Sequence, residues 1–180
     1  LAGILSAPHD SPMPTNIRNT DKLLSGREQK LRANDGKAAA WRLRMDHAKH
    51  LLKIDKLGWH DCLSGTHNIN PDIFGDAVIA RGDIGVSYHL AVVIDDALDQ
   101  ISLVTRGIDL APSTHLHRLL QELLDLPTPT YLHHALVCDT NGKRLSKRNG
   151  AESIANLRSA GKRRTEIFDE LPALPTPSQR

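Results

Sequence analysis

The sequence predicts an α/β fold in which helices alternate with the strands of a largely parallel sheet. Two observations support this class. Residues 101–105 form a short apolar run, followed by a helix-like segment at 115–124 and a second strand-like segment at 131–138. Upstream, apolar residues recur at helical spacing across residues 87–98. A strand, a crossover helix and a second strand in this order are typical of parallel pairing.

The first part of the chain is less regular. Residues 8–37 are rich in Pro, Asn, Asp, Ser and charged side chains, which predicts a loop with short helical stretches. In residues 38–45, apolar Trp41, Leu43 and Met45 alternate with arginines. Alternation with a period of two predicts a half-buried strand with these three side chains on its inner face.

The same rules assign most of the remaining chain. Asn, Gly and Asp mark turns, Pro stops helices, and Ser or Thr caps them. The further elements are a strand at 74–80, a turn at 81–83, a Pro-Ser-Thr cap at 112–114, a break at 126–129, a turn at 139–142 and helices at 151–160 and 165–171.

Composition limits the classes of protein that fit. The 180 residues are 39% hydrophobic and 24% charged, as in an ordinary domain with or without an appendage. With 23 Lys and Arg against 21 Asp and Glu, no overall basic field indicates a nucleic-acid binder, so any RNA contact must be local. Cys62 and Cys138 are far apart, and neither a signal peptide nor a long apolar run is present. We therefore expect a cytoplasmic protein that is monomeric and makes no membrane contact.

One segment has the chemistry of a phosphate-binding loop. Residues 141–150, NGKRLSKRNG, place four basic side chains around Ser146 between two glycines: Lys143, Arg144, Lys147 and Arg148. Lysine donors and backbone N–H groups suit the phosphates of ATP, where negative charge must be neutralised. The alternative from composition alone is a solvated basic turn.

Tyr88 and Arg106 form the second candidate site. Arg106 ends a predicted strand, and ligands of open parallel sheets bind at strand ends. Its guanidinium suits a carboxylate, and the Tyr88 hydroxyl can orient an amino or carboxyl group. The structural alternatives are a core tyrosine with a surface hydroxyl and an arginine paired with a nearby aspartate: Asp95, Asp96 or Asp109.

Ten histidines raise the question of a metal site. His115 and His117 do not share a helix face, and His133 and His134 point to opposite sides of a strand. No cysteine or acidic residue lies at a metal-site interval from them. We predict no metal site.

Residues 81–151 resemble the second half of the catalytic domain of the glutamyl/glutaminyl-tRNA synthetase family, which belongs to class I. The resemblance rests on SYHLAVVIDDA at 87–97, RGIDL at 106–110 and RLSKR at 144–148, in the family's order. The last segment is similar to the family's Lys-Met-Ser-Lys-Ser signature loop, which closes over ATP. Several motifs in order are a specific signal, whereas one alone is weak.

The resemblance implies a fold and a division of the chain. It implies the second half of a class I synthetase Rossmann-like catalytic domain, preceded by a partly irregular inserted region. We expect an inserted, acceptor-binding-like region at 1–70, the second half of the nucleotide-binding domain at 71–151, and short helices with a tail at 152–180.

It also implies roles for individual residues. Tyr88 and Arg106 fall on the family's amino-acid-binding positions, and residues 144–148 fall on its ATP loop. Lys147 would stabilise the α-phosphate while glutamyl adenylate forms and pyrophosphate leaves, with Mg²⁺ expected beside ATP. The chain ends at Arg180, soon after this loop, as in the truncated glutamyl-queuosine tRNA(Asp) synthetase branch. That branch activates L-glutamate and transfers it to queuosine in the anticodon of tRNA(Asp).

Two departures from the family pattern matter. The family's N-terminal half, with its His-Ile-Gly-His-type ATP signature, is absent, and Leu1 stands where a Met would begin a complete chain. We therefore expect a fragment with an unpaired sheet edge. Relatives often bind zinc through cysteines, but Met13 and Ile17 occupy two of those positions here, so we expect no zinc. The alternative function is a non-catalytic remnant that binds tRNA or a partner.

Overall fold

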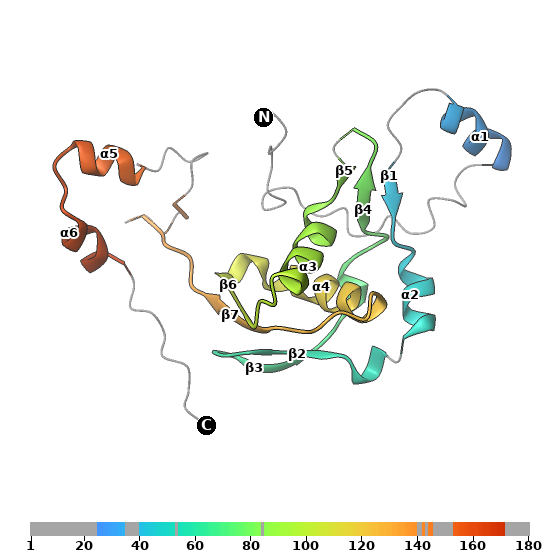
Figure 1. Cartoon of the computed structure of the whole chain (residues 1–180), viewed down its shortest axis with the longest axis horizontal. Helices are drawn as coiled ribbons and strands as arrows, with labels where there is room; N and C mark the ends of the chain where they lie inside the picture. Colours follow the sequence, from blue (N-terminus) through green and yellow to red (C-terminus); the bar gives the residue numbers. More distant parts are fainter. Residues whose placement is uncertain are drawn as a thin grey trace.

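A computed structural model describes residues 25–34, 40–52, 54–83, 85–139, 142, 144–145 and 153–171. Figure 1 shows two small sheets, with helices α3 and α4 lying near both of them. The helices are α1 Gly26–Asn34, α2 Met45–Leu51, α3 Tyr88–Leu98, α4 Ala111–Leu123, α5 Ile154–Ser159 and α6 Arg164–Asp169. The strands are β1 Ala40–Arg42, β2 Gly58–Asp61, β3 Gly65–Asn68, β4 Val78–Arg81, β5 Gly85–Val86, β6 Leu103–Gly107 and β7 Thr130–His134.

The larger sheet has four strands in the order β3-β2-β7-β6. Strand β7 is parallel to both β6 and β2, and α4 forms the crossover between β6 and β7. The predicted α/β class is therefore confirmed. Parallel pairing aligns the carboxyl ends of β6 and β7, which places Arg106 opposite His133.

The smaller sheet has the order β1-β4-β5 and is antiparallel throughout. A largely parallel sheet was expected, and that expectation is wrong for this part of the fold. Strands β4 and β5 are joined by the predicted turn after Arg81, and so short a connection permits only antiparallel pairing. Gly85, with φ +78°, begins β5 in a conformation that favours glycine.

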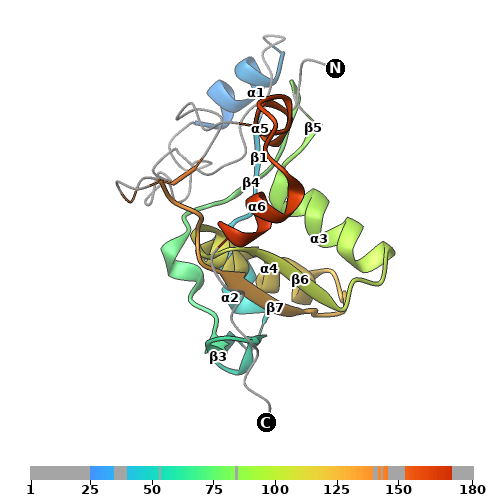
Figure 2. The ribbon, with the colours of Figure 1, turned by 90° about the vertical axis from the view of Figure 1, so that its left-hand side faces the viewer.

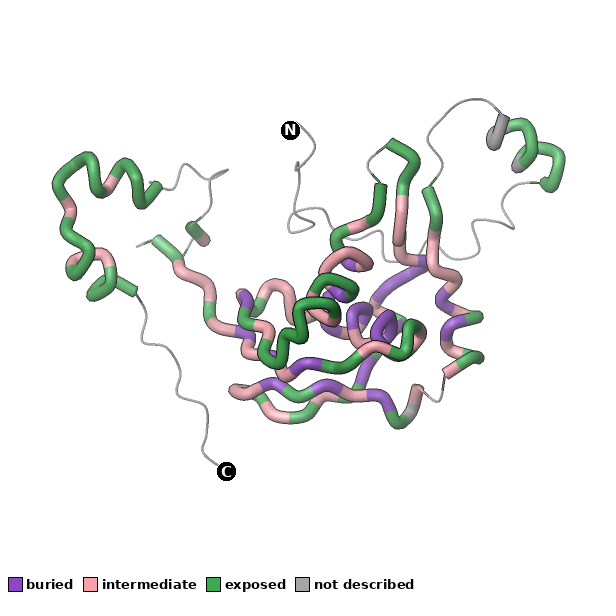
Figure 3. The backbone as a smooth tube through the Cα atoms, viewed as in Figure 1, coloured by how far each residue is buried: buried purple, intermediate pink, exposed green. Residues whose placement is uncertain are grey.

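The core lies between α4 and the four-stranded sheet. Helix α4 buries Leu116, Leu119 and Leu120, which share one face at helical spacing. Opposite them lie Trp59 of β2 and Tyr131 of β7, whose ring centroids are 5.6 Å apart. Figure 3 shows the buried segments gathered in α4, in the strands beneath it and at the start of α2.

Helices α3, α5 and α6 confirm the predicted helices near residues 87–98, 151–160 and 165–171. Ser87 caps α3 by accepting a hydrogen bond from the backbone N–H of Leu90 at 3.4 Å. Figure 1 shows α5 and α6 apart from the two sheets, and Figure 2, turned by 90°, shows α3 and α4 beside the larger sheet.

The predicted half-buried strand at 38–45 needs correction. Strand β1 spans only three residues, and Trp41 is 69% exposed rather than on an inner face. Among the described strands, β1 is outermost in its sheet, and no buried hydrophobic residue of the core covers Trp41 there. Met45 is fully buried but begins α2, where its N–H donates to Asp76 Oδ1 at 3.0 Å.

Two element boundaries and the burial of one strand also differ from expectation. Helix α4 begins at Ala111, so Ser113 and Thr114 lie buried in its first turn instead of capping it. The strand predicted at 131–138 ends at His134. Strand β6, expected to be buried, is an outermost strand among those described, and Leu103 is 44% exposed.

Several predictions fall outside the described residues or are not tested. Met13 and Ile17, at the zinc positions, and Ser146 to Arg148 of the basic loop lie outside the described part of the chain. The proposed division at residue 70 remains a prediction, although β2 and β7 pair across it. None of the described helices is long and apolar enough to span a membrane.

Candidate functional site

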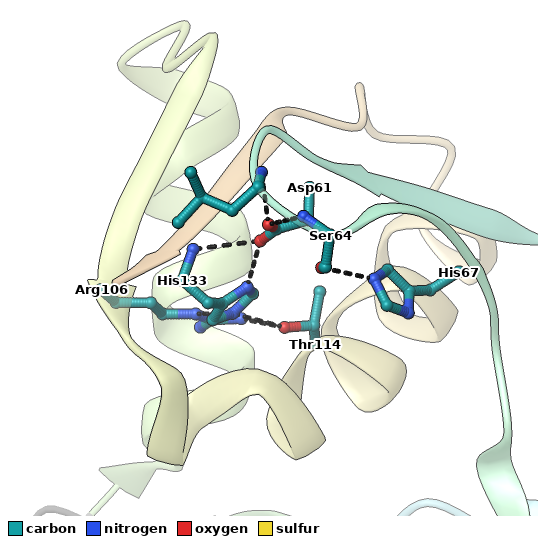
Figure 4. Close-up of polar contacts among 7 residues, drawn as sticks. Asp61, Ser64, His67, Arg106, Thr114 and His133 are labelled. Atoms are coloured by element: carbon teal, nitrogen blue, oxygen red, sulfur yellow. Dashed lines mark hydrogen bonds and ion pairs between the residues drawn. The ribbon is translucent and has the colours of Figure 1, made fainter. Parts of the chain in front are cut away.

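Arg106 is the centre of a buried polar cluster at the carboxyl end of β6. It is 8% exposed, and each guanidinium nitrogen donates one hydrogen bond. Nε donates to His133 Nε2 at 3.1 Å, and the two terminal nitrogens reach His117 Nδ1 at 3.1 Å and Thr114 Oγ1 at 2.6 Å. Figure 4 shows the Arg106 side chain running alongside His133 toward Thr114. All three acceptors are neutral groups, so the cation has no direct carboxylate partner in this set of bonds.

His133 links Arg106 to a buried carboxylate. Its Nδ1 lies 2.7 Å from Asp61 Oδ2, and its backbone N–H donates to the same oxygen at 3.0 Å. The other oxygen, Oδ1, accepts from the backbone N–H groups of Leu63 and Ser64 at 2.9 and 3.0 Å. Asp61 therefore ends β2, caps the turn of the β2–β3 hairpin and holds that turn against β7 (Figure 4).

The hydrogen bonds keep Asp61 ionised in spite of its burial. Burial alone would raise its pKa, but the bonds from the His133 side chain and from the backbone N–H groups of Leu63, Ser64 and His133 lower the pKa to about 2. A carboxylate that accepts several N–H groups is stabilised in its charged form. The His133 ring thus lies between one cation, Arg106, and one anion, Asp61. Asp96, one of the aspartates considered above as a partner of Arg106, interacts with it electrostatically.

The second histidine of the cluster connects Arg106 to α3. Because a guanidinium only donates, His117 Nδ1 must accept from Arg106, and its proton lies on Nε2. Nε2 is 3.0 Å from Nδ1 of His89, which is also buried. The Tyr88 ring borders this pair, with centroids 6.0 Å from His117 and 5.6 Å from His89.

Both histidines that face Arg106 are held neutral. Burial lowers the pKa of His117 well below its usual value, and the positive charge of Arg106 lowers it further. Burial also lowers the pKa of His133, although the hydrogen bond to Asp61 opposes this shift. Neutral imidazoles are required here, because protonation would remove the lone pairs that accept from Arg106.

The Tyr131 ring packs against the guanidinium of Arg106. The Arg106 guanidinium carbon lies 5.2 Å from the centroid of this buried ring, a cation–π distance. Gln121 Nε2 donates to the Tyr131 hydroxyl at 3.0 Å. Burial raises the pKa of Tyr131, so the phenol remains neutral. The Tyr131 ring, held by Gln121, therefore covers one face of the planar guanidinium.

The structure brings two of the predicted site residues near each other and leaves most of the others undescribed. Tyr88 and Arg106 both contact His117, so one side chain joins them. Arg106 ends its strand as predicted, while Tyr88 is 41% exposed at the start of α3. Lys147, the predicted catalytic residue, lies outside the described residues.

Only the beginning of the predicted ATP loop is described. Arg144 bonds to Asp109 Oδ2 at 2.6 Å and forms an isolated bridge with Cys138, and Leu145 N–H donates to Val137 O at 2.9 Å. Asp109 is therefore a partner of Arg144, not of Arg106 as one structural alternative had it. This contact places the first loop residue just beyond the carboxyl end of β6.

Sequence reasoning missed four residues of the cluster as site residues: Asp61, Thr114, His117 and His133. His117 and His133 were considered only as metal ligands. Thr114, His117 and Gln121 are polar residues at helical spacing on the apolar face of α4, and that pattern could have revealed a buried polar site. Among the described residues, no group of three or more His, Cys, Asp or Glu side chains could hold a metal ion.

The fold agrees with the comparisons to known proteins. The model of the catalytic domain of class I tRNA synthetases (E and Q) matches residues 8–175. The chain belongs to this family.

Among its relatives, the Glutamyl-Q tRNA(Asp) synthetase of Rhodobacter capsulatus is 44% identical over 126 residues, which are 68% of this chain and 45% of that protein. The protein of the same name from Symbiobacterium thermophilum is 36% identical over 89% of this chain and 48% of its own length. The chain spans about half the length of these relatives.

A solved structure is also similar. It is the crystal structure of a glutamate tRNA ligase from Elizabethkingia meningosepticum in complex with its amino acid. Its sequence is 30% identical to this chain and its TM-score is 0.54. The match covers 71% of this chain and 24% of the ligase.

Proposed function

We propose that this chain forms part of an ATP-dependent enzyme that activates L-glutamate and transfers it to queuosine in tRNA(Asp). The observation that carries the proposal is the state of Arg106: a buried cation whose hydrogen-bond partners are all neutral. Family membership and the relatives named Glutamyl-Q tRNA(Asp) synthetase supply the reaction class.

Arg106 has the unused capacity that a carboxylate site needs. A guanidinium has five N–H groups, and the bonds to Thr114, His117 and His133 use one on each nitrogen. Within the described part of the chain, one N–H on each terminal nitrogen has no acceptor and is left to donate. Two N–H groups at the ends of the planar fork match the two oxygens of a carboxylate.

The reaction assigns that carboxylate. In activation, an oxygen of the glutamate α-carboxylate attacks the α-phosphorus of ATP, a mixed anhydride forms, and the bond to pyrophosphate breaks. The α-carboxylate must therefore be free to attack, so we assign the side-chain carboxylate to Arg106. Tyr88, which is 41% exposed and in ring contact with His117, is assigned to orient the amino acid through its hydroxyl.

The ATP side of the site is assigned to residues 144–148. The bond from Arg144 to Asp109 starts this loop next to the carboxyl end of β6, close in sequence to Arg106. Lys147 is assigned to the α-phosphate, where its charge would stabilise the negative charge of the transition state. Mg²⁺ is expected to accompany the ATP phosphates, since this ion commonly binds through phosphates and few protein ligands.

The transfer step rests on the relatives. Queuosine of tRNA(Asp) is the acceptor suggested by their names. A cytoplasmic location and a monomeric state remain predictions from the sequence.

Glutamate-dependent exchange of pyrophosphate into ATP, measured without tRNA, tests the proposal. Exchange by the unaltered chain that Lys147→Ala abolishes and that Lys56→Ala, at an exposed lysine beyond the cluster, preserves would support the proposal. No exchange by the unaltered chain would contradict activation by this chain alone while leaving its family membership unaffected, and a non-catalytic tRNA- or partner-binding protein would stand as the alternative.

A further inference from the structure

We propose that Asp61 and His133 are positioning residues that hold Arg106 in the orientation required for a substrate carboxylate. The inference rests on the proposed function and names how the same site is built. Figure 4 shows the chain of contacts from the β2–β3 hairpin through His133 to Arg106. Neither Asp61 nor His133 is assigned a direct contact with substrate.

The first argument concerns the position of one proton. Arg106 Nε–H points at His133 Nε2 across 3.1 Å, so Nε2 must present its lone pair. A neutral imidazole with a free Nε2 carries its proton on Nδ1, and Nδ1 lies 2.7 Å from Asp61 Oδ2. The carboxylate therefore selects the tautomer that can accept from Arg106, as carboxylates do for metal-binding histidines.

The second argument concerns the distance between the charges. A direct Arg–Asp pair would be the stronger interaction for stability alone, because a carboxylate accepts from both ends of the guanidinium fork. Here Asp61 is separated from Arg106 by the His133 ring, and its oxygens accept from Leu63, Ser64 and His133. Asp61 therefore does not occupy the guanidinium fork, whose printed hydrogen bonds go to Thr114, His117 and His133.

The third argument is that the acceptor on the other side is fixed in the same manner. His117 accepts from Arg106 through Nδ1 and directs Nε2 toward Nδ1 of His89 at 3.0 Å. The imidazoles of His117 and His133 thus each present a lone pair to Arg106. His89 orients the first ring from its other nitrogen, and Asp61 orients the second. Asp61 is the charged one of these two outer groups, so its loss should have the larger effect.

Asp61→Asn tests the inference because it changes the tautomer while keeping the shape. If the amide oxygen keeps the bonds to Leu63 and Ser64, its NH₂ group occupies the place of Oδ2 and donates toward His133 Nδ1. The His133 proton must then move to Nε2, where it opposes Arg106 Nε–H. Asp83→Asn is the matched control, since Asp83 pairs with Arg81 at the surface.

Long-range ¹H–¹⁵N NMR spectra of histidine-labelled protein report the tautomers, and the Arg106 Nε–H signal reports its hydrogen bond. We expect His133 protonated on Nδ1 in the unaltered chain and in Asp83→Asn, and on Nε2 in Asp61→Asn, with a shifted Arg106 signal. The affinity for L-glutamate should fall about tenfold or more in Asp61→Asn, the range seen when outer-shell partners are removed.

The outcomes separate this inference from the proposed function. An Nε2-protonated His133 in the unaltered chain overturns the inference even if Asp61→Asn does not fold. An unchanged tautomer and Arg106 signal in folded Asp61→Asn also overturn it. If the tautomers are as stated and the unaltered chain binds no glutamate, the proposed function fails while the orientation of Arg106 by Asp61 stands.

Discussion

His133 Nδ1 lies 2.7 Å from Asp61 Oδ2, and both side chains are almost completely buried, at 2% and 1% exposure. The two residues are 72 positions apart in the chain. Their contact joins the turn after β2 to the middle of the larger sheet. It also sets the direction in which the His133 ring faces Arg106, so one contact serves both the fold and the candidate site.

The buried histidines predict that stability falls in mild acid. The pKa values of His117 and His133 are lowered in the folded state, so below the ordinary histidine value of 6.5 the unfolded chain binds more protons than the folded chain. Stability therefore rises with pH in this window and declines as pH falls below 6.5. The free energy of unfolding, from urea denaturation at pH 7.5, 6.5 and 5.5, should fall by up to about 1.4 kcal/mol per pH unit for each histidine.

One variant checks the cause of this decline. His117→Gln should reduce the dependence of the unfolding free energy on pH by the contribution of one histidine. Equal stability of the unaltered chain at pH 7.5 and 5.5 would show that these histidines are not held neutral by the fold.

The chain's two tryptophans provide a test of the core. Trp59 is 5% exposed, stacks on His67 with centroids 4.3 Å apart and contacts Tyr131, whereas Trp41 is 69% exposed. Trp59→Ala should lower the free energy of unfolding by about 3–5 kcal/mol or prevent folding. Trp41→Ala should change it by only about 0.5 kcal/mol. Urea denaturation followed by circular dichroism measures both, and similar losses in the two variants would contradict this packing.

Among the described strands of the larger sheet, β6 is outermost, and its edge predicts non-specific aggregation of the otherwise monomeric chain at high concentration. Leu103 of β6 is 44% exposed, and Leu98 at the end of α3 is 75% exposed. An outer strand with apolar side chains can pair with a second chain, and a charged residue there opposes such pairing. Leu103→Lys should reduce concentration-dependent light scattering, whereas Leu171→Lys, at a leucine 48% exposed beyond α6, should not. If light scattering by the unaltered chain does not rise with concentration, the edge of β6 does not pair with a second chain.

Local patterns predicted the fold well where neighbours in sequence decide it. Ser87 before an apolar repeat located α3, and the turn after Arg81 ended β4 as expected. The β2–β3 hairpin was not predicted, because Gly58 to Asn68 contains one strongly apolar aromatic and several polar residues. Its pairing depends on the contact of Asp61 with β7, which no local pattern contains.

The candidate site divides in the same way. The position of Arg106 at a strand end followed from an apolar run and a glycine, and the resemblance supplied its proposed role. The groups around it come from α4, β7 and the β2–β3 hairpin, so only the fold brings them together. Trp41 shows the opposite error. Its alternation with Leu43 and Met45 indicated an inner face, but β1 spans only three residues, Met45 lies in α2, and Trp41 is 69% exposed.

The most direct test of the central claim is calorimetric titration of the chain with L-glutamate, repeated on Arg106→Lys and on Arg81→Lys, a surface arginine paired with Asp83. Lysine keeps the charge but loses the planar fork. We predict binding to the unaltered chain and to Arg81→Lys, and about 10- to 100-fold weaker binding to Arg106→Lys, because a hydrogen bond to a charged group contributes about 1.5–3 kcal/mol. Equal affinity in Arg106→Lys, or no binding by the unaltered chain, would contradict the claim that Arg106 holds the substrate carboxylate.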